Sequence, residues 1–329
     1  MKYKHISAIN VFSCLCVVII HLTSNLVINL NKESVWYLVF FLINKLLTFA
    51  VPAFVFLSGY KLYNKYRDGK IELTKFYMNR FKKIVIPYLI AYVIYYLYFY
   101  YLGWVKLDDF VKQLILGTLA AHFYYIVLSI QFYALFPLFR YALNKHSFAF
   151  LTISFIITIA FNYFLNFEYI DRLFCTYILY FAIGMFASKK FNNMPFSQKN
   201  LLYISYGIIV IVHVTLCYKM SLGLLYYRYA GIGQVFFSIM SILLVYDTSI
   251  IISNKQKRFL NKLIEFIEPC TYNIYLYHIL VINMVRYSIL SDFDITLKQD
   301  FIINFITVFL TIIIYTVFHN KLSKIKYIN

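Results

Sequence analysis

Residues 8–30 read AINVFSCLCVVIIHLTSNLVINL, a run that contains no lysine, arginine, aspartate or glutamate. A helix needs roughly 20 mostly apolar residues to cross the hydrocarbon core of a membrane. This run is long enough to do so, and we expect it to form a retained membrane-spanning helix. Similar runs recur along the rest of the chain, so this first one indicates the class of the whole fold.

The composition supports the same class of protein. Of 329 residues, 62% are hydrophobic and 21% are aromatic, whereas only 13% are charged. Soluble domains are about 25% charged, so a soluble enzyme, a nucleic-acid-binding protein and a disordered protein are all excluded. We expect an all-α fold, a polytopic transmembrane helical bundle that forms one domain over residues 1–329.

Short segments that carry charge, proline or glycine separate the apolar runs and set the number of spans. The pattern predicts about ten spans, at residues 8–30, 35–57, 84–102, 122–143, 147–166, 170–188, 201–219, 229–250, 270–290 and 301–319. Two interpretations of residues 113–143 stay open, since they contain either one span or a short re-entrant piece followed by a span. The longest inner loop is expected at residues 58–83.

The distribution of charge predicts the orientation in the membrane. The chain has 31 lysines and arginines against 13 acidic residues. Most of the basic residues fall on loops that share one side, and cytoplasmic loops carry such an excess. We therefore expect both termini in the cytoplasm, and the protein in the plasma membrane of a bacterium.

Polar side chains inside apolar spans are costly and usually face the interior of a bundle. His21 lies near the middle of the first span, where a neutral imidazole can accept a proton near pH 7. The alternative is a hydrogen bond that only joins two helices. Asn10 lies eleven residues earlier, about three turns, and so on the same helix face. The full set is Asn10, His21, Asn44, Lys45, Gln131, Asn162, His213, Asp247, Asn273, His278 and Asn283.

Two further segments lie near the predicted membrane boundary. Ser58-Gly59-Tyr60 is typical of a helix that stops at a glycine. Arg80 and Lys83 are three residues apart and would share one face of an α-helix. Such a pair can hold the phosphates of an anionic cofactor, or it can contact lipid headgroups.

Together and in this order, these segments resemble the membrane acyltransferase 3 family, in particular its short stand-alone members. The resemblance covers roughly residues 5–320. Asn10 occupies the position of a family arginine, Lys83 that of a second arginine, and Phe123 that of a tryptophan. The matching stretches are Asn10 to His21; Pro52, Phe54, Ser58, Gly59 and Tyr60; Arg80, Lys83, Ile84, Pro87 and Tyr88; His122 to Tyr125 with Tyr133 and Pro137; Tyr180, Gly184 and Met185; and Ile274 to His278.

The resemblance implies a transmembrane O-acyltransferase that uses acetyl-CoA or another short acyl-CoA as co-substrate. Its acceptor would be a hydroxyl of a cell-surface glycan or of the lipid-linked precursor. It implies no tightly bound cofactor, no metal and no nucleic acid, and its other partners would be membrane lipids and glycan-synthesis proteins. His21 would be the catalytic base, Arg80, Lys83, Asn10 and Ser58 would bind the cofactor, and His122, Tyr124, His278 and Tyr275 would bind or support the substrate.

Two other classes of membrane protein stay open at this point. One is a polysaccharide exporter or flippase without enzymatic activity, whose sugar path would be lined by the 34 tyrosines and 34 phenylalanines. The missing charge at Asn10 favours this alternative. The other is an ion-coupled transporter in which Asp247 and His213 relay protons.

Overall fold

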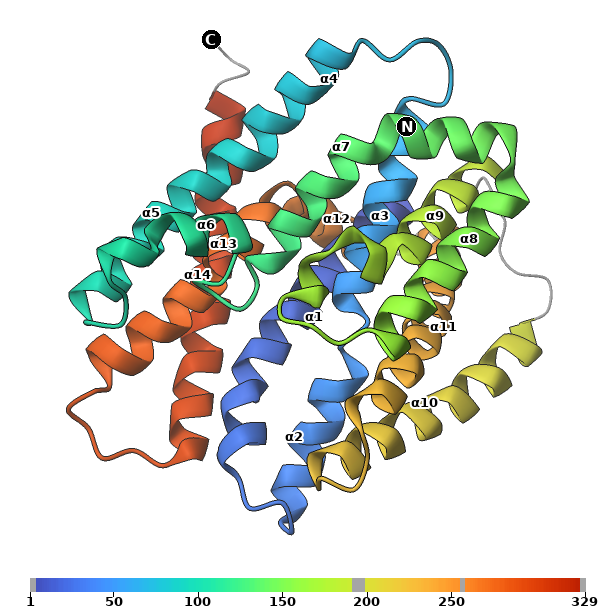
Figure 1. Cartoon of the computed structure of the whole chain (residues 1–329). Coiled ribbons are helices and arrows are strands. Elements are labelled where there is room, and N and C mark those ends of the chain that lie inside the picture. Colours follow the sequence, from blue (N-terminus) through green and yellow to red (C-terminus); the bar gives the residue numbers. More distant parts are fainter. Residues whose placement is uncertain (1–3, 191–198, 255–257, 326–329) are drawn as a thin grey trace. The chain divides into compact units, whose positions relative to one another are not determined.

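The computed structural model describes residues 4–190, 199–254 and 258–325, and all regular structure in these ranges is helical (Figure 1). A chain in lipid favours helices, because a helix satisfies its own backbone hydrogen bonds. The all-α polytopic class is therefore confirmed. Nine helical segments of the described ranges are long and apolar enough to cross a membrane: Lys4–Asn29, Val35–Lys65, Leu73–Tyr101, Tyr124–Lys145, Ser147–Phe164, Ile170–Lys190, Asn200–Ser221, Tyr229–Ser253 and Leu297–Ser323.

These nine segments correspond to nine of the ten predicted spans, and the tenth differs. Residues 270–290 form the shorter helix α13 (Thr271–Met284), which continues into a π turn at Val285–Ile289. A 3-10 turn at Glu268–Cys270 precedes the helix. Pro269 lies in that turn and cannot donate a backbone hydrogen bond, which favours a break there. The predicted span at residues 270–290 is thus helical but is not among the nine candidate membrane-spanning segments of the described residues.

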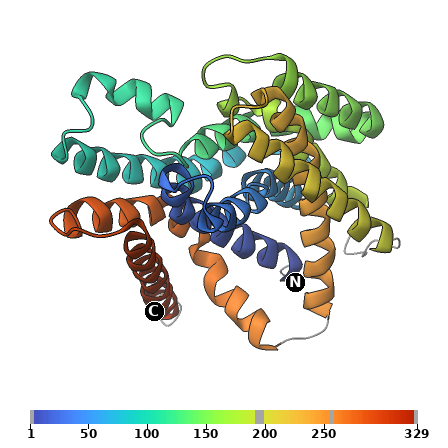
Figure 2. The ribbon, with the colours of Figure 1, turned by 90° about the horizontal axis from the view of Figure 1, so that it is seen from below.

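The chain divides into two compact units, and each is described by itself. Unit 1 comprises the residues up to Ala50 and those from Val245 onward. Its helices are α1 (Lys4–Asn29), α2 (Val35–Leu46), α12 (Arg258–Ile267), α13 and α14 (Leu297–Ile325). Helix α1 is central in this unit, because it contacts each of the other four. Helices α13 and α14 also contact each other and are joined by a loop, as Figure 2 shows in orange and dark red.

Unit 2 comprises residues 51–244. Its helices are α3 (Ala50–Lys65), α4 (Leu73–Arg80), α5 (Ile86–Tyr101), α6 (Phe110–Leu116), α7 (Tyr124–Lys145), α8 (Ser147–Ile159), α9 (Phe174–Lys190), α10 (Lys199–Ser221) and most of α11 (Tyr227–Asn254). Helix α9 contacts both α7 and α8. A second π turn at Phe81–Val85 connects α4 to α5.

Three tyrosines on α5 hold residues 106–114, the segment before α7 for which the sequence left two interpretations open. The hydroxyls of Tyr88 and Tyr92 donate to the backbone oxygens of Leu114 (2.8 Å) and Phe110 (2.6 Å). The hydroxyl of Tyr96, one turn further along α5, donates to the oxygen of Lys106. Residues four apart share a helix face, so one face of α5 holds the whole segment. Residues before the span α7 thus form the short helix α6, and its placement in the membrane stays a prediction.

Gly59 does not end a helix, which corrects the interpretation of Ser58-Gly59-Tyr60. Helix α3 continues to Lys65, and Gly59 faces α9. A Cβ atom at Gly59 would lie 2.2 Å from the backbone oxygen of Phe181, and one at Gly184 would lie 2.0 Å from that of Phe56. The two glycines therefore let the backbones of α3 and α9 touch, as small residues commonly do between membrane helices.

The expected inner loop at residues 58–83 is also mostly helical. Helix α3 extends to Lys65 and α4 begins at Leu73, so only the residues between them lack helical structure. The hydropathy pattern predicts that the span ends where the charged residues begin. A helix nevertheless continues beyond the membrane wherever its backbone hydrogen bonds are favourable, and charge does not stop it.

Candidate functional site

Several of the polar residues inside the spans join one segment of the chain to another. In unit 1, Nδ2 of Asn44 donates to the backbone oxygen of Ile20 and to Oγ1 of Thr23, both at 3.0 Å. In unit 2, Nε2 of Gln131 donates to the backbone oxygen of Arg172 at 2.7 Å. Asn162 and Asn273 are hydrogen-bonded in similar ways. These side chains satisfy backbone and side-chain groups that would otherwise be costly in lipid.

Two histidines of unit 1 form a different kind of arrangement. His21 of α1 and His278 of α13 lie with their ring centroids 5.2 Å apart, and the planes are tilted by 45°. The depth of each residue in its helix predicted that the two would be neighbours, within about 10 Å. Tyr275 lies one turn before His278, and its ring centroid is 6.0 Å from that of His278. His278 is buried, whereas His21 is partly accessible.

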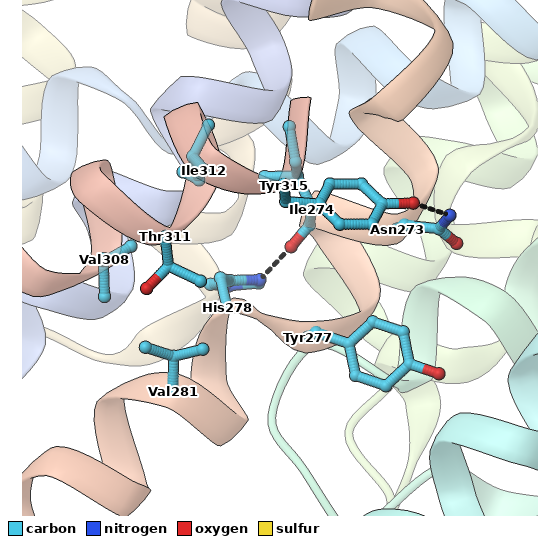
Figure 3. Close-up of a pocket in the computed structure, with 9 residues that line it drawn as sticks. All are labelled: Asn273, Ile274, Tyr277, His278, Val281, Val308, Thr311, Ile312 and Tyr315. Carbon is cyan, nitrogen blue, oxygen red and sulfur yellow. Dashed lines mark hydrogen bonds between the residues drawn. The ribbon is translucent and has the colours of Figure 1, made fainter. Parts of the chain in front are cut away.

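The hydrogen bonds of His278 select its tautomer. Its Nδ1 lies 2.8 Å from the backbone oxygen of Tyr275 and 3.2 Å from that of Ile274, and Figure 3 shows the second contact. Carbonyl oxygens only accept hydrogen bonds, so Nδ1 must carry the proton. In a neutral imidazole the other nitrogen, Nε2, is then the one that can accept a proton. The backbone of α13 thus orients the basic nitrogen of His278.

Asn10 takes part in the contact between α1 and the start of α13. Its Nδ2 donates to Oγ1 of Thr271 at 2.9 Å, and that hydroxyl donates to the backbone oxygen of Glu268, also at 2.9 Å. Sγ of Cys14, one turn further along α1, lies 3.4 Å from the backbone oxygen of Thr271. Asn10 therefore positions α13 against α1, and its predicted contact with the cofactor remains a hypothesis.

In unit 2, a second cluster of polar side chains brings together residues from three of the stretches that resemble the acyltransferase family. Oγ of Ser58 lies 3.4 Å from the hydroxyl of Tyr125 and is close enough to the hydroxyl of Tyr133 to interact with it. The guanidinium carbon of Arg80 lies 5.5 Å from the ring centroid of Tyr133 and 5.6 Å from that of Phe76. Within the described part of the chain, the buried Nε of Arg80 has no hydrogen-bond partner. A cation held between two rings with an unmet donor is suited to an anionic ligand.

Lys83 lies in different surroundings from Arg80. Arg80 ends α4 and is partly buried, whereas Lys83 lies in the π turn and is exposed. The shared face expected from their spacing assumes an α-helix with 3.6 residues per turn. A π turn bonds residues five apart and changes that geometry. The two cations thus differ in burial and in local backbone, and their joint contact with a cofactor stays a prediction.

His122 and Tyr124 lie where the chain turns into α7. His122 is buried, with its ring centroid 4.5 Å from that of Phe123 and 5.8 Å from that of Tyr95. Tyr124 is the first residue of α7 and is partly accessible. His122 thus packs against Phe123 and against Tyr95 of α5, and the predicted contacts of both residues with the substrate remain hypotheses.

A cluster of charged and amide side chains in unit 1 escaped the sequence analysis. Nε and Nη2 of Arg286 donate to the two carboxylate oxygens of Asp300, at 3.1 and 2.7 Å. Nδ2 of Asn25 donates to the same carboxylate at 3.1 Å, and Nδ2 of Asn304 donates to it at 2.9 Å. Asp300 is buried, with 6% of its surface exposed. The one signal in the sequence was an arginine and an aspartate at the facing ends of two consecutive spans.

Comparison with known proteins identifies the family of this chain. Residues 5–319 match the acyltransferase domain that defines the acyltransferase 3 family. The chain is also 27% identical over 306 residues to a protein of Bacillus subtilis (strain 168) named "Putative membrane-bound acyltransferase YfiQ", a match that covers 84% of this chain and 80% of that protein. No solved structure was found to match the chain. Because the family match spans nearly the whole sequence, the chain belongs to the acyltransferase 3 family and is a membrane-bound acyltransferase.

Proposed function

We propose that this protein transfers a short acyl group from a CoA thioester to a hydroxyl of a cell-surface glycan or of its lipid-linked precursor. The reaction would take place in the plasma membrane of a bacterium, with the CoA on the cytoplasmic side. The observation that carries the proposal is the pairing of His21 and His278, 5.2 Å apart between two helices of a membrane acyltransferase. The family assignment also favours an enzyme over the exporter and the ion-coupled transporter.

The proposed reaction needs one group that takes a proton and later returns it. The acceptor oxygen attacks the thioester carbonyl carbon, a C–O bond forms, and the C–S bond breaks. The proton of the hydroxyl passes to a base, and the CoA sulfur leaves as a thiolate that takes up a proton. No oxidant or reductant is needed, because the acyl group moves from sulfur to oxygen without a change in the oxidation state of its carbonyl carbon.

His21 is assigned the role of the base. It is partly accessible, unlike the buried His278, so an acceptor hydroxyl can approach it. His278 is assigned a supporting role, because its basic Nε2 can share a proton with His21 directly or through one water molecule. Two protonated imidazoles at this distance would repel each other, so the pair would carry at most one extra proton. Tyr275 supports His278 through its backbone oxygen.

The cluster of polar side chains in unit 2 is assigned to binding the acyl-CoA donor. Arg80, whose guanidinium faces the rings of Phe76 and Tyr133, would bind a phosphate of CoA, and Ser58 would contribute its hydroxyl. Lys83 is exposed and would add a screened, longer-range attraction. CoA binds as a co-substrate and leaves after each turnover, so no cofactor is retained. His122 and Tyr124 are assigned to the acceptor side.

Acyl analysis of the cell envelope tests this function. Surface glycans would be isolated from cells that lack the gene, from cells complemented with it, and from cells carrying an inactive variant. Ester-linked acyl groups would be released by mild alkali and measured by mass spectrometry. We expect acyl esters only with the active gene. Glycans that reach the surface in normal amount and carry the same esters in all three strains would refute the proposal, whereas loss of the glycan itself would favour the exporter.

A further inference from the structure

A cavity of about 160 Å³ lies in unit 1 between α13 and α14 (Figure 3). Helix α13 contributes five of the nine residues that line the cavity, and α14 contributes the other four. The residues that line it are Asn273, Ile274, Tyr277, His278, Val281, Val308, Thr311, Ile312 and Tyr315.

Two polar side chains of the cavity wall donate their hydrogen bonds within the protein, to another lining residue or to the backbone. Nδ2 of Asn273 donates to the hydroxyl of Tyr315 at 2.5 Å, which Figure 3 shows at one end of the cavity. Oγ1 of Thr311 donates to the backbone oxygen of Thr307 at 2.8 Å. These groups have little left to offer a sugar, whose hydroxyls would lose their hydrogen bonds to water. The remaining wall is mostly hydrocarbon, so the cavity suits an alkyl group.

One imidazole among the lining residues connects this cavity to the candidate catalytic site. His278 forms part of the wall, and its ring lies 5.2 Å from that of His21. An alkyl group in the cavity would contact His278, and its polar end, when turned toward α1, would lie beside the pair of histidines. That is where the carbonyl carbon of a donor must lie if His21 activates the attacking hydroxyl.

We propose that the cavity between α13 and α14 is the acyl pocket of this enzyme and accepts acyl groups of about four to six carbons. This inference rests on the proposed function and specifies its donor. The size follows from comparison, because an apolar protein cavity of about 150 Å³ accommodates benzene, a molecule of six carbons. An acetyl group places a single methyl there and would leave most of the volume unfilled.

The pocket predicts how activity depends on chain length. Burying one methylene group changes an equilibrium roughly fourfold. A butanoyl group has two methylenes more than an acetyl group, so kcat/KM should rise about 15-fold from acetyl-CoA to butanoyl-CoA. It should stop rising near six carbons, where the cavity is full, and decline for longer chains.

The test uses the purified full-length protein in lipid nanodiscs with acyl-CoA donors of two to eight carbons. Val281→Phe fills the cavity from α13 and should lower the ratio of butanoyl to acetyl transfer at least tenfold. Thr311→Leu narrows it from α14 and should lower the same ratio, which provides a second variant if Val281→Phe fails to fold. Met284→Phe is the matched control, since Met284 is an exposed residue of α13 outside the cavity, and this variant should keep the ratio of the unaltered protein.

A binding measurement separates failure of the pocket from failure of the proposed function. Thioethers of CoA with ethyl, butyl and hexyl groups cannot transfer an acyl group, yet their affinities report the pocket. Affinity that rises with chain length in the unaltered protein, but not in Val281→Phe, supports the pocket. If the same protein turns over none of the acyl-CoA donors, the proposed function is refuted while the pocket stands. Transfer that is fastest with acetyl-CoA, with a ratio unaffected by Val281→Phe, would overturn the pocket and assign the cavity to a membrane lipid tail.

Discussion

The carboxylate of Asp300 accepts four hydrogen bonds, and replacing it with asparagine tests the packing around the histidine pair. Oδ1 accepts from Nε of Arg286 and from Asn304, and Oδ2 accepts from Nη2 of Arg286 and from Asn25. Asn25 lies one turn beyond His21 on α1. The cluster thus joins α1, α14 and the π turn that follows α13.

The magnitude follows from the four donors that face this carboxylate. In Asp300→Asn, one oxygen becomes an NH₂ group that faces two donors, so two of the four hydrogen bonds are lost together with the negative charge. Breaking a buried ion pair costs about 3–5 kcal/mol. The Arg286 side chain is 20% exposed and that of Asp300 is 8% exposed. Because water reaches part of the pair, we expect a loss of unfolding free energy near the lower limit of this range, about 3 kcal/mol. At roughly 2 °C per kcal/mol for a large chain, the melting temperature should fall by about 6 °C.

The assay is thermal unfolding of the purified protein in detergent, followed by tryptophan fluorescence and by size-exclusion chromatography. Asp294→Asn, which removes an exposed carboxylate from the loop before α14, is the control and should leave the melting temperature unchanged. A double variant with leucine at Asp300 and methionine at Arg286 should recover part of the loss, because it leaves no unpaired charge. A melting temperature for Asp300→Asn within 1 °C or so of the unaltered protein would refute the reasoning.

Three further predictions concern packing, donor binding and topology. In Gly184→Val, the added side chain should keep α9 away from α3, so little folded protein should be recovered by fluorescence-detected size exclusion, and normal recovery would contradict the close crossing. The combined change of Arg80 and Lys83 to glutamine should weaken acyl-CoA binding at least tenfold and flatten its salt dependence, as measured by calorimetry in nanodiscs; unchanged affinity would assign both residues to lipid headgroups. Cysteines placed at Lys2 and Lys326, which lie outside the described residues, should react with an impermeant maleimide only in permeabilised cells, and labelling of intact cells would refute cytoplasmic termini.

The fold class was predictable because the membrane sets the length of its helices. Nine of the predicted apolar runs lie in nine helical segments of the described residues that are long enough to cross a membrane, and their positions followed from hydropathy. The ends were less predictable, since α3 continues through Gly59 to Lys65. A glycine can end a helix or admit a neighbouring helix, and only the position of α9 distinguishes the two. Hydropathy likewise could not show that the helix of residues 271–284 continues into a π turn.

Parts of the candidate site were predictable for a similar reason. Counting residues from the ends of two spans placed His21 and His278 at similar depth, and their rings are indeed neighbours. The partner of Asn10 and the cluster around Asp300 were not predictable, because each depends on which helices pack together. The π turn between Arg80 and Lys83 was missed because the residues that form it read as an ordinary helix.

Acyl transfer by variants of His21 tests the central claim most directly. Purified protein in nanodiscs would be given labelled acyl-CoA and acceptor glycan, at matched amounts of folded protein. General-base catalysis typically contributes about 10²–10⁴-fold, so His21→Ala and His21→Gln should each lower kcat by at least 100-fold while acyl-CoA still binds. His146→Gln, a change of an exposed histidine at the end of α7, is the control and should keep full activity. Full transfer by His21→Gln would contradict the account.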